Sequence, residues 1–224
     1  MPTQFDADLN TLKEKLLHMG AIAEKMIHAI NAVILDQAGH LLTEIYEHEK
    51  ELDQLQGEID EETIRLIGVY TPVAGDLRLL LMVTRINADI ERIGDKIVDI
   101  CHNVENFLQE KRAKKFVDFA HITHVTEQML RDALNAFVNR SSTEAMAVIH
   151  ADDEVDQLTD QTFRVLFTHI LDEPQAIAHI LGLMLTAQSL ERIADHAVNI
   201  AEDVVYMVKG KDIRHQGTNG NQEG

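Results

Sequence analysis

The sequence predicts an all-α fold: two tandem three-helix bundles related by a pseudo-twofold axis. Three observations lead to this prediction: the composition, apolar residues at helical spacing, and a second half that repeats the first. Only 3 of the 224 residues are proline, 11 are glycine and 4% are aromatic, so few residues interrupt helices. Leucine, alanine, methionine, glutamate and glutamine are abundant, and these residues favour helices.

The first bundle is expected over residues 5–110. Apolar residues recur every three or four positions over 5–35, the period of one helix face. A second helix is expected over 41–69, because Pro72 forbids its continuation. The third begins near Asp76, whose carboxylate suits a helix N-terminus. Its heptad seam is continuous and consists of Leu79, Val83, Ile86, Ile90, Ile93, Ile97, Ile100, Val104 and Phe107.

The second bundle is expected over residues 117–210. Its first helix covers about 117–138, and Ser141-Ser142-Thr143-Glu144 is an N-cap pattern for the next helix. A sixth helix is expected to open at Asp172-Glu173-Pro174 and to run to about residue 209. The stretch 211–224 is polar and glycine-rich, which predicts a disordered tail.

The two halves share sequence at a nearly constant offset. Residues 89–100 match residues 189–200 at an offset of 100, and residues 49–55 match 152–158 at an offset of 103. Two copies of one three-helix unit explain both matches.

Each repeat carries two acidic-x-x-x-Asp motifs, and the i, i+4 spacing puts both carboxylates of a motif on one helix face. The positions of Glu91 and Asp95 lie outside the heptad seam, so they are expected on the bundle surface. The predicted metal ligands are Glu49, Asp53, Glu91 and Asp95 in the first half, and Asp152, Asp156, Glu191 and Asp195 in the second.

Such a patch would repel itself unless cations neutralise it, and oxygen ligands suit hard cations such as Mg²⁺, Mn²⁺, Ca²⁺ or Fe³⁺. Exposed acidic residues are common and often simply hydrated, but repetition of four motifs in register favours metal binding. Asp60 and Asp99 would extend the stripe in the first half, whereas their counterparts are Phe163 and Asn199.

The net charge of −18 argues against nucleic acid as a partner, because phosphate binding needs clustered Lys and Arg. The single cysteine, Cys101, lies in an apolar helical stretch and is expected to be buried, which fits a reducing compartment. No apolar run is long enough for a transmembrane segment, so a cytoplasmic location is expected. The Glu-x-x-His motifs of di-iron enzymes in helical bundles do not occur in the chain, so a non-enzymatic protein is expected.

Asp76-Leu77-Arg78, followed by apolar residues and then by Ile90-Glu91-Arg92-Ile93-Gly94-Asp95, resembles the pattern of PhoU proteins. The stretch from Leu190 to Glu202 is similar to the second repeat of that family. The likeness covers about residues 5–210. One departure is Gln175-Ala176-Ile177-Ala178, which stands where the first half has Gly75-Asp76-Leu77-Arg78.

The resemblance implies two three-helix bundles whose acidic motifs bind iron or zinc clusters, with Mg or Mn as alternatives from ligand chemistry. It also implies a regulator that couples the ATPase subunit of a phosphate ABC transporter to a phosphate-sensing histidine kinase, at the inner face of the plasma membrane. Such a protein represses the phosphate-starvation response when phosphate is plentiful, and a homodimer is expected. Two alternatives stay open: an accessory protein of a low-affinity phosphate carrier, and a metal-free helical adaptor.

Overall fold

The computed structural model describes residues 3–108, 119–172 and 174–213, and these residues form helices without any strand. The helices are α1 (Gln4–Asp36), α2 (Leu41–Tyr70), α3 (Gly75–Leu108), α4 (Phe119–Asn139), α5 (Ser142–Asp172) and α6 (Ile177–Lys209), with a 3₁₀ turn, η1 (Pro174–Ala176), before α6. The prediction of an all-α protein is confirmed.

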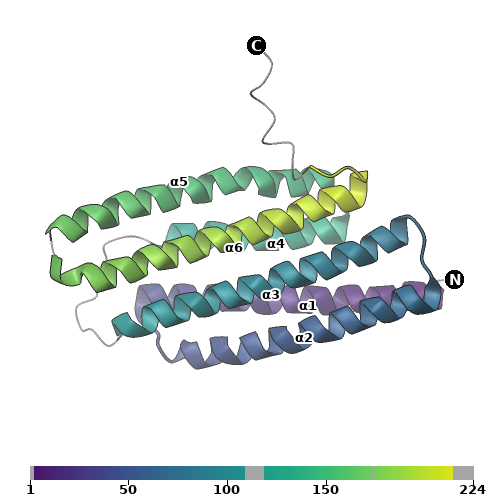
Figure 1. Ribbon diagram of the computed structural model, residues 1–224, viewed down its shortest axis with the longest axis horizontal. Coiled ribbons are helices and arrows are strands. Elements are labelled where there is room, and N and C mark those ends of the chain that lie inside the picture. Colours follow the sequence, from purple (N-terminus) through teal and green to yellow (C-terminus); the bar gives the residue numbers. More distant parts are fainter. Residues whose placement is uncertain (1–2, 109–118, 173, 214–224) are drawn as a thin grey trace, which may run out of the picture.

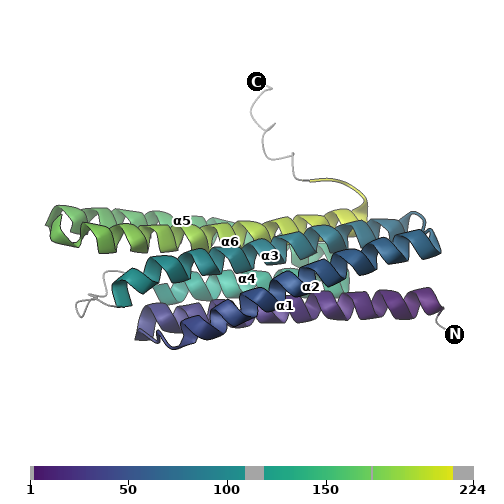
Figure 2. The same cartoon turned by 60° about the horizontal axis from the view of Figure 1, so that its bottom comes forward.

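The six helices form two bundles of three. Helices α1, α2 and α3 pack on one another, and so do α4, α5 and α6. The bundles join chiefly along α3 and α6, which lie side by side in both views, with a second contact between α1 and α4 (Figures 1 and 2). Because the repeats are equivalent in sequence, the α3–α6 contact brings equivalent helices together across the pseudo-twofold axis.

The heptad seam of α3 lies in the core. Its residues from Leu79 to Val104 are all buried, and so are the equivalent residues of α6 from Leu190 to Val204. Cys101 is buried beside this seam, as expected. Burial of a full helix face in each repeat is the main contribution to the stability of both bundles.

The predicted helix ends are close to the observed ones. The hydroxyl of Ser141 accepts a hydrogen bond of 3.2 Å from the backbone N–H of Glu144, as expected for the N-terminus of α5. The α-helix after Pro174 begins three residues later than expected, because 174–176 form a 3₁₀ turn. The predicted bundle boundaries at 110 and 117, and residues 214–224 of the predicted tail, lie outside the described residues.

The Asp-Leu-Arg segment at the start of α3 contacts the end of α6. The guanidinium carbon of Arg78 lies 5.8 Å from the centroid of the Tyr206 ring, within cation–π range. The equivalent residue of the second repeat is Ala178, which has no charged group. This link between bundles therefore belongs to the first repeat alone.

Candidate metal-binding surfaces

The first carboxylate row consists of Glu49 and Asp53 on α2 with Glu91 and Asp95 on α3. The two glutamates are half-buried and the two aspartates are exposed. Burial raises the pKa of Glu49, and the charges of Asp53 and Asp95 raise it further. Burial likewise raises the pKa of Glu91, with further contributions from Asp95 and Asp53. Carboxylates of α2 and α3 thus repel one another across the helix pair, so the fold brings all four into one row.

Close packing beneath the first row explains this convergence. Leu52 lies on α2 between the two acidic positions, and Gly94 occupies the matching place on α3. A Cβ atom on Gly94 would lie 2.7 Å from Cδ1 of Leu52, inside normal contact distance. The missing side chain therefore lets Leu52 pack directly against the α3 backbone.

The second carboxylate row consists of Asp152 and Asp156 on α5 with Glu191 and Asp195 on α6. Its pattern of exposure repeats the first row: Asp152 and Glu191 are half-buried, and the other two are exposed. Burial, followed by the charges of Asp156 and Asp195, raises the pKa of Asp152 to about 6. Burial followed by neighbouring carboxylates also raises the pKa values of Glu191 and Asp195. Three members of the second row therefore have raised pKa values, against two in the first row, and burial is the largest cause in each case.

Asp160 is a member of this surface that was not predicted from the sequence. Its charge contributes to the raised pKa of Glu191, and it continues the i, i+4 series of Asp152 and Asp156 along α5. The prediction relied on agreement between the repeats, and the equivalent position in the first half is Gly57. A search within one helix would have found it.

The outer aspartates considered from the sequence have other partners, and so do two histidines on α3 and α6. Asp60 Oδ1 accepts a hydrogen bond of 3.0 Å from Asn87, and Asp99 accepts one of 2.6 Å from Lys96. Nδ1 of His102 lies 3.4 Å from the hydroxyl of Tyr46, and Nδ1 of His196 lies 2.9 Å from a carboxylate oxygen of Asp89. These contacts occupy groups that could otherwise have extended the rows.

Each row offers oxygen donors on neighbouring helices, which is the ligand set of hard cations. Arg92 lowers the pKa of Glu91, but burial and the neighbouring carboxylates outweigh it. Within residues 3–108, 119–172 and 174–213, no three His, Cys, Asp or Glu side chains are already grouped to hold one ion. The rows are thus open surfaces of unneutralised carboxylates rather than closed cages, and a bound cation would draw the exposed aspartates inward.

Comparison with known proteins agrees with the repeat. The family model of the PhoU domain matches the chain twice, over residues 16–104 and 119–204. The chain belongs to the PhoU family. The phosphate-specific transport system accessory protein PhoU homolog of Pseudomonas aeruginosa is 35% identical over 216 residues, covering 96% of this chain and 89% of the relative. PhoU of Escherichia coli K12 is 31% identical, with coverage of 96% and 89%.

Solved PhoU structures share the fold. The crystal structure of PhoU from Pseudomonas aeruginosa superposes with a TM-score of 0.89 at 32% identity, covering 93% of this chain and all of that one. The phosphate transport system regulatory protein PhoU from Streptococcus pneumoniae gives a TM-score of 0.83 at 22% identity, covering 94% and 99%. The family is one of accessory proteins rather than enzymes, as expected. Among the described helices, none combines the length and apolarity needed to cross a bilayer.

Proposed function

We propose that this chain is an accessory regulator of phosphate uptake that couples the ATPase subunit of a phosphate ABC transporter to a phosphate-sensing histidine kinase. The observation that carries the proposal is relatedness over nearly the whole chain to accessory proteins of the phosphate-specific transport system. In this role the protein represses the phosphate-starvation response when phosphate is plentiful. It acts in the cytoplasm, at the inner face of the membrane, where its partners hold it.

Deletion tests this role directly. Cells without the protein are expected to express alkaline phosphatase in high phosphate, and the full chain supplied in trans restores repression. Repression that survives the deletion contradicts the regulatory role. A defect confined to a low-affinity phosphate carrier would instead assign the protein to that carrier, and the ABC transporter would not be its partner.

Metal binding is the second component of the proposal. Both rows gather carboxylates that raise one another's pKa values, and hard cations relieve this repulsion. Elemental analysis of purified protein should find metal in the wild type and not in the variant with Glu91, Asp95, Glu191 and Asp195 changed to Ala. The matched control changes four exposed carboxylates outside the rows, Glu14, Asp36, Glu47 and Glu61. Equal, negligible metal in all three proteins would contradict metal binding and would favour the alternative of a metal-free helical adaptor.

Partner binding is supported by exposed apolar side chains at the tips of two helical hairpins. Val73 and Leu81 lie at the α2–α3 end, and Leu171, Ile177 and Leu181 lie at the α5–α6 end; all are at least 47% exposed. The two tips lie at opposite ends of the molecule (Figure 1). Exposed apolar surface of this kind is typical of protein interfaces, so the two ends can engage two proteins at once.

We expect the metal to fix the surface that docks both partners. Pull-down of the transporter ATPase and of the kinase is expected to weaken when a chelator is added, and unchanged binding would leave the metal without a docking role.

The exposed apolar side chains at the two hairpin tips also support a homodimer. Light scattering of the purified protein should give twice the mass of 25.3 kDa, and the mass of a single chain would contradict the dimer.

A further inference from the structure

The seam between α3 and α6 has two sides that the pseudo-twofold axis relates, and one side is closed by ionic contacts. Asp89 lies 2.9 Å from Nδ1 of His196 and accepts a hydrogen bond of 3.4 Å from Asn199. Arg85 donates a hydrogen bond of 3.2 Å to Asp203. Both carboxylates are buried, Asp89 with 7% and Asp203 with 3% of its surface exposed. On this closed side, carboxylates bridge the bundles.

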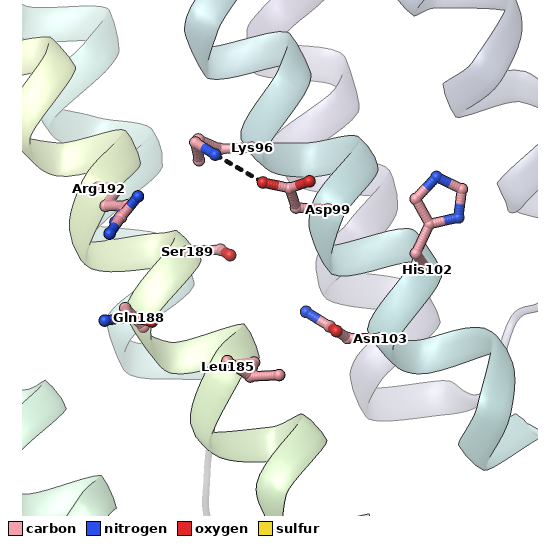
Figure 3. Close-up of a pocket in the computed structure, with 8 residues that line it drawn as sticks. All are labelled: Lys96, Asp99, His102, Asn103, Leu185, Gln188, Ser189 and Arg192. Carbon is pink, nitrogen blue, oxygen red and sulfur yellow. Dashed lines mark hydrogen bonds and ion pairs between the residues drawn. The ribbon is translucent and has the colours of Figure 1, made fainter.

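The equivalent side of the seam is open. At the offset of 100 residues, Ser189 stands where Asp89 stands on the closed side, and Asn103 stands where Asp203 does. Leu185 likewise replaces Arg85. The neutral replacements leave a pocket of about 270 Å³ between the two helices, and Figure 3 shows Ser189 and Leu185 facing Asn103 across the seam. Both bridging carboxylates of the closed side are therefore missing here.

The open side has two cations of its own. Lys96 of α3 and Arg192 of α6 both line the pocket, and Asp99 neutralises one of them through its 2.6 Å contact with Lys96. The side chains of Ser189 and Asn103 point into the space between the helices (Figure 3). The lining of the pocket therefore combines two cations, one carboxylate and neutral hydrogen-bond donors. Arg192 also acts on Glu191 and Asp195, whose pKa values it lowers.

We propose that this pocket binds a small oxyanion such as inorganic phosphate, held by Lys96, Arg192, Ser189 and Asn103. The anion takes the place that the Asp89 and Asp203 carboxylates take on the closed side, and it bridges the two bundles. A water molecule's share of liquid volume is about 30 Å³, so the pocket has room for such an anion together with bridging waters. Arg and Lys are the usual ligands of phosphate oxygens. The site borders the second carboxylate row, because Arg192 acts on Glu191 and Asp195, but its charge preference is the opposite one.

Equilibrium dialysis of the chelator-treated full chain against radiolabelled inorganic phosphate at pH 7 tests the site. Saturable binding near one phosphate per chain is expected. Lys96→Gln and Arg192→Gln each remove one charge-assisted contact and should weaken binding by about tenfold or more. Ser189→Asp rebuilds the carboxylate of the closed side next to Lys96, so it should abolish binding. Its melting temperature should equal or exceed that of the wild type, which shows that the loss is not due to unfolding.

The matched control is Arg92→Gln, which removes the residue equivalent to Arg192 from the other repeat and should bind phosphate like the wild type. Absence of saturable binding to folded wild type overturns the proposal. So does a Ser189→Asp variant that binds normally, an Arg92→Gln variant as weak as Arg192→Gln, or phosphate binding that occurs only in protein not treated with chelator. Each of these results leaves the role in phosphate transport intact, because that role is judged by the deletion.

Discussion

The two carboxylate rows occupy equivalent places in the two repeats, yet they differ in how far the pKa values of their carboxyl groups are raised. In the second row, the pKa of Asp152 rises to about 6 and those of Glu191 and Asp195 are raised as well. In the first row, the raised values are those of Glu49 and Glu91. Burial is the largest cause of the raised pKa values in both rows. The second row also has more negative charge nearby, because Asp153 and Asp160 stand where the first half has Lys50 and Gly57.

This difference teaches that sequence repetition preserves the position of a carboxylate row without fixing the electrostatic environment of its members. A cation gains more where more carboxylates compete for space, since its binding relieves their mutual repulsion. We therefore expect the second row to bind a hard cation more tightly than the first.

Removing carboxylates from one row at a time should give the largest change in Mn²⁺ affinity. Asp156→Asn with Glu191→Gln removes two charge-assisted contacts, so Mn²⁺ affinity at the second row should fall by about a hundredfold or more. Asp53→Asn with Glu91→Gln should leave the tighter binding event intact and abolish the weaker one. Titration calorimetry of metal-free protein measures both. Loss of the tighter event in the first-row variant instead would reverse the comparison.

Exchanging Gly57 and Asp160, one of the positions that differ between α2 and α5, should shift Mn²⁺ affinity by a smaller amount. Gly57→Asp continues the first row as Asp160 continues the second, and a Cβ atom at Gly57 meets nothing within 4 Å. One added charge-assisted contact should raise first-row Mn²⁺ affinity by about tenfold. Asp160→Asn should lower second-row affinity to a similar degree. If neither change alters the titration, the extra carboxylate does not cause the difference between rows.

Stability of the metal-free protein should depend on pH through Asp152. Because its pKa rises from 3.8 to about 6 in the folded protein, protonation favours the fold. That stabilisation is complete below pH 3.8 and is lost as the pH rises through about 6. Asp152→Asn should therefore increase the free energy of unfolding at pH 7 by about 1 to 2 kcal/mol, with solvent screening taken into account.

Urea unfolding of the metal-free protein at pH 4 and pH 7 measures this gain. The difference between Asp152→Asn and wild type should be present at pH 7 and much smaller at pH 4. Glu49→Gln is the matched change in the first row and should give a smaller gain. Equal stability of wild type and Asp152→Asn at pH 7 would show that the second row is not under electrostatic strain.

Exchanging the small residues beneath the rows, Gly94 and Ala194, should have the smallest effect, a change in the free energy of unfolding. Ala194→Gly should cost about 1 kcal/mol of stability, the usual difference in a helix interior. Gly94→Ala gains about the same propensity but forces Leu52 to turn away, so the net change should lie within about 1 kcal/mol. Urea unfolding measures both. A loss above about 3 kcal/mol for Gly94→Ala would show that Leu52 cannot move.

The sequence predicted what depends on periodicity within a helix. The heptad seam around Ile90 and Ile97 is buried as expected, and so is its equivalent around Ile193. The motif carboxylates lie on the helix faces that their spacing indicated. Residues whose partners depend on how the bundles dock could not be predicted this way. The contact of Asp89 with His196 joins residues 107 positions apart. The pocket opposite it likewise joins residues of α3 to residues of α6.

Anomalous diffraction from crystals soaked in Mn²⁺ tests the central claim most directly, because it locates the ion. We expect one difference peak among Asp152, Asp156, Glu191 and Asp195 and a weaker one among Glu49, Asp53, Glu91 and Asp95, each within about 2.6 Å of carboxylate oxygens. Crystals of the variant with Glu91, Asp95, Glu191 and Asp195 changed to Ala should show neither peak. Soaked wild-type crystals without a peak at either row would contradict the assignment of these surfaces as metal sites.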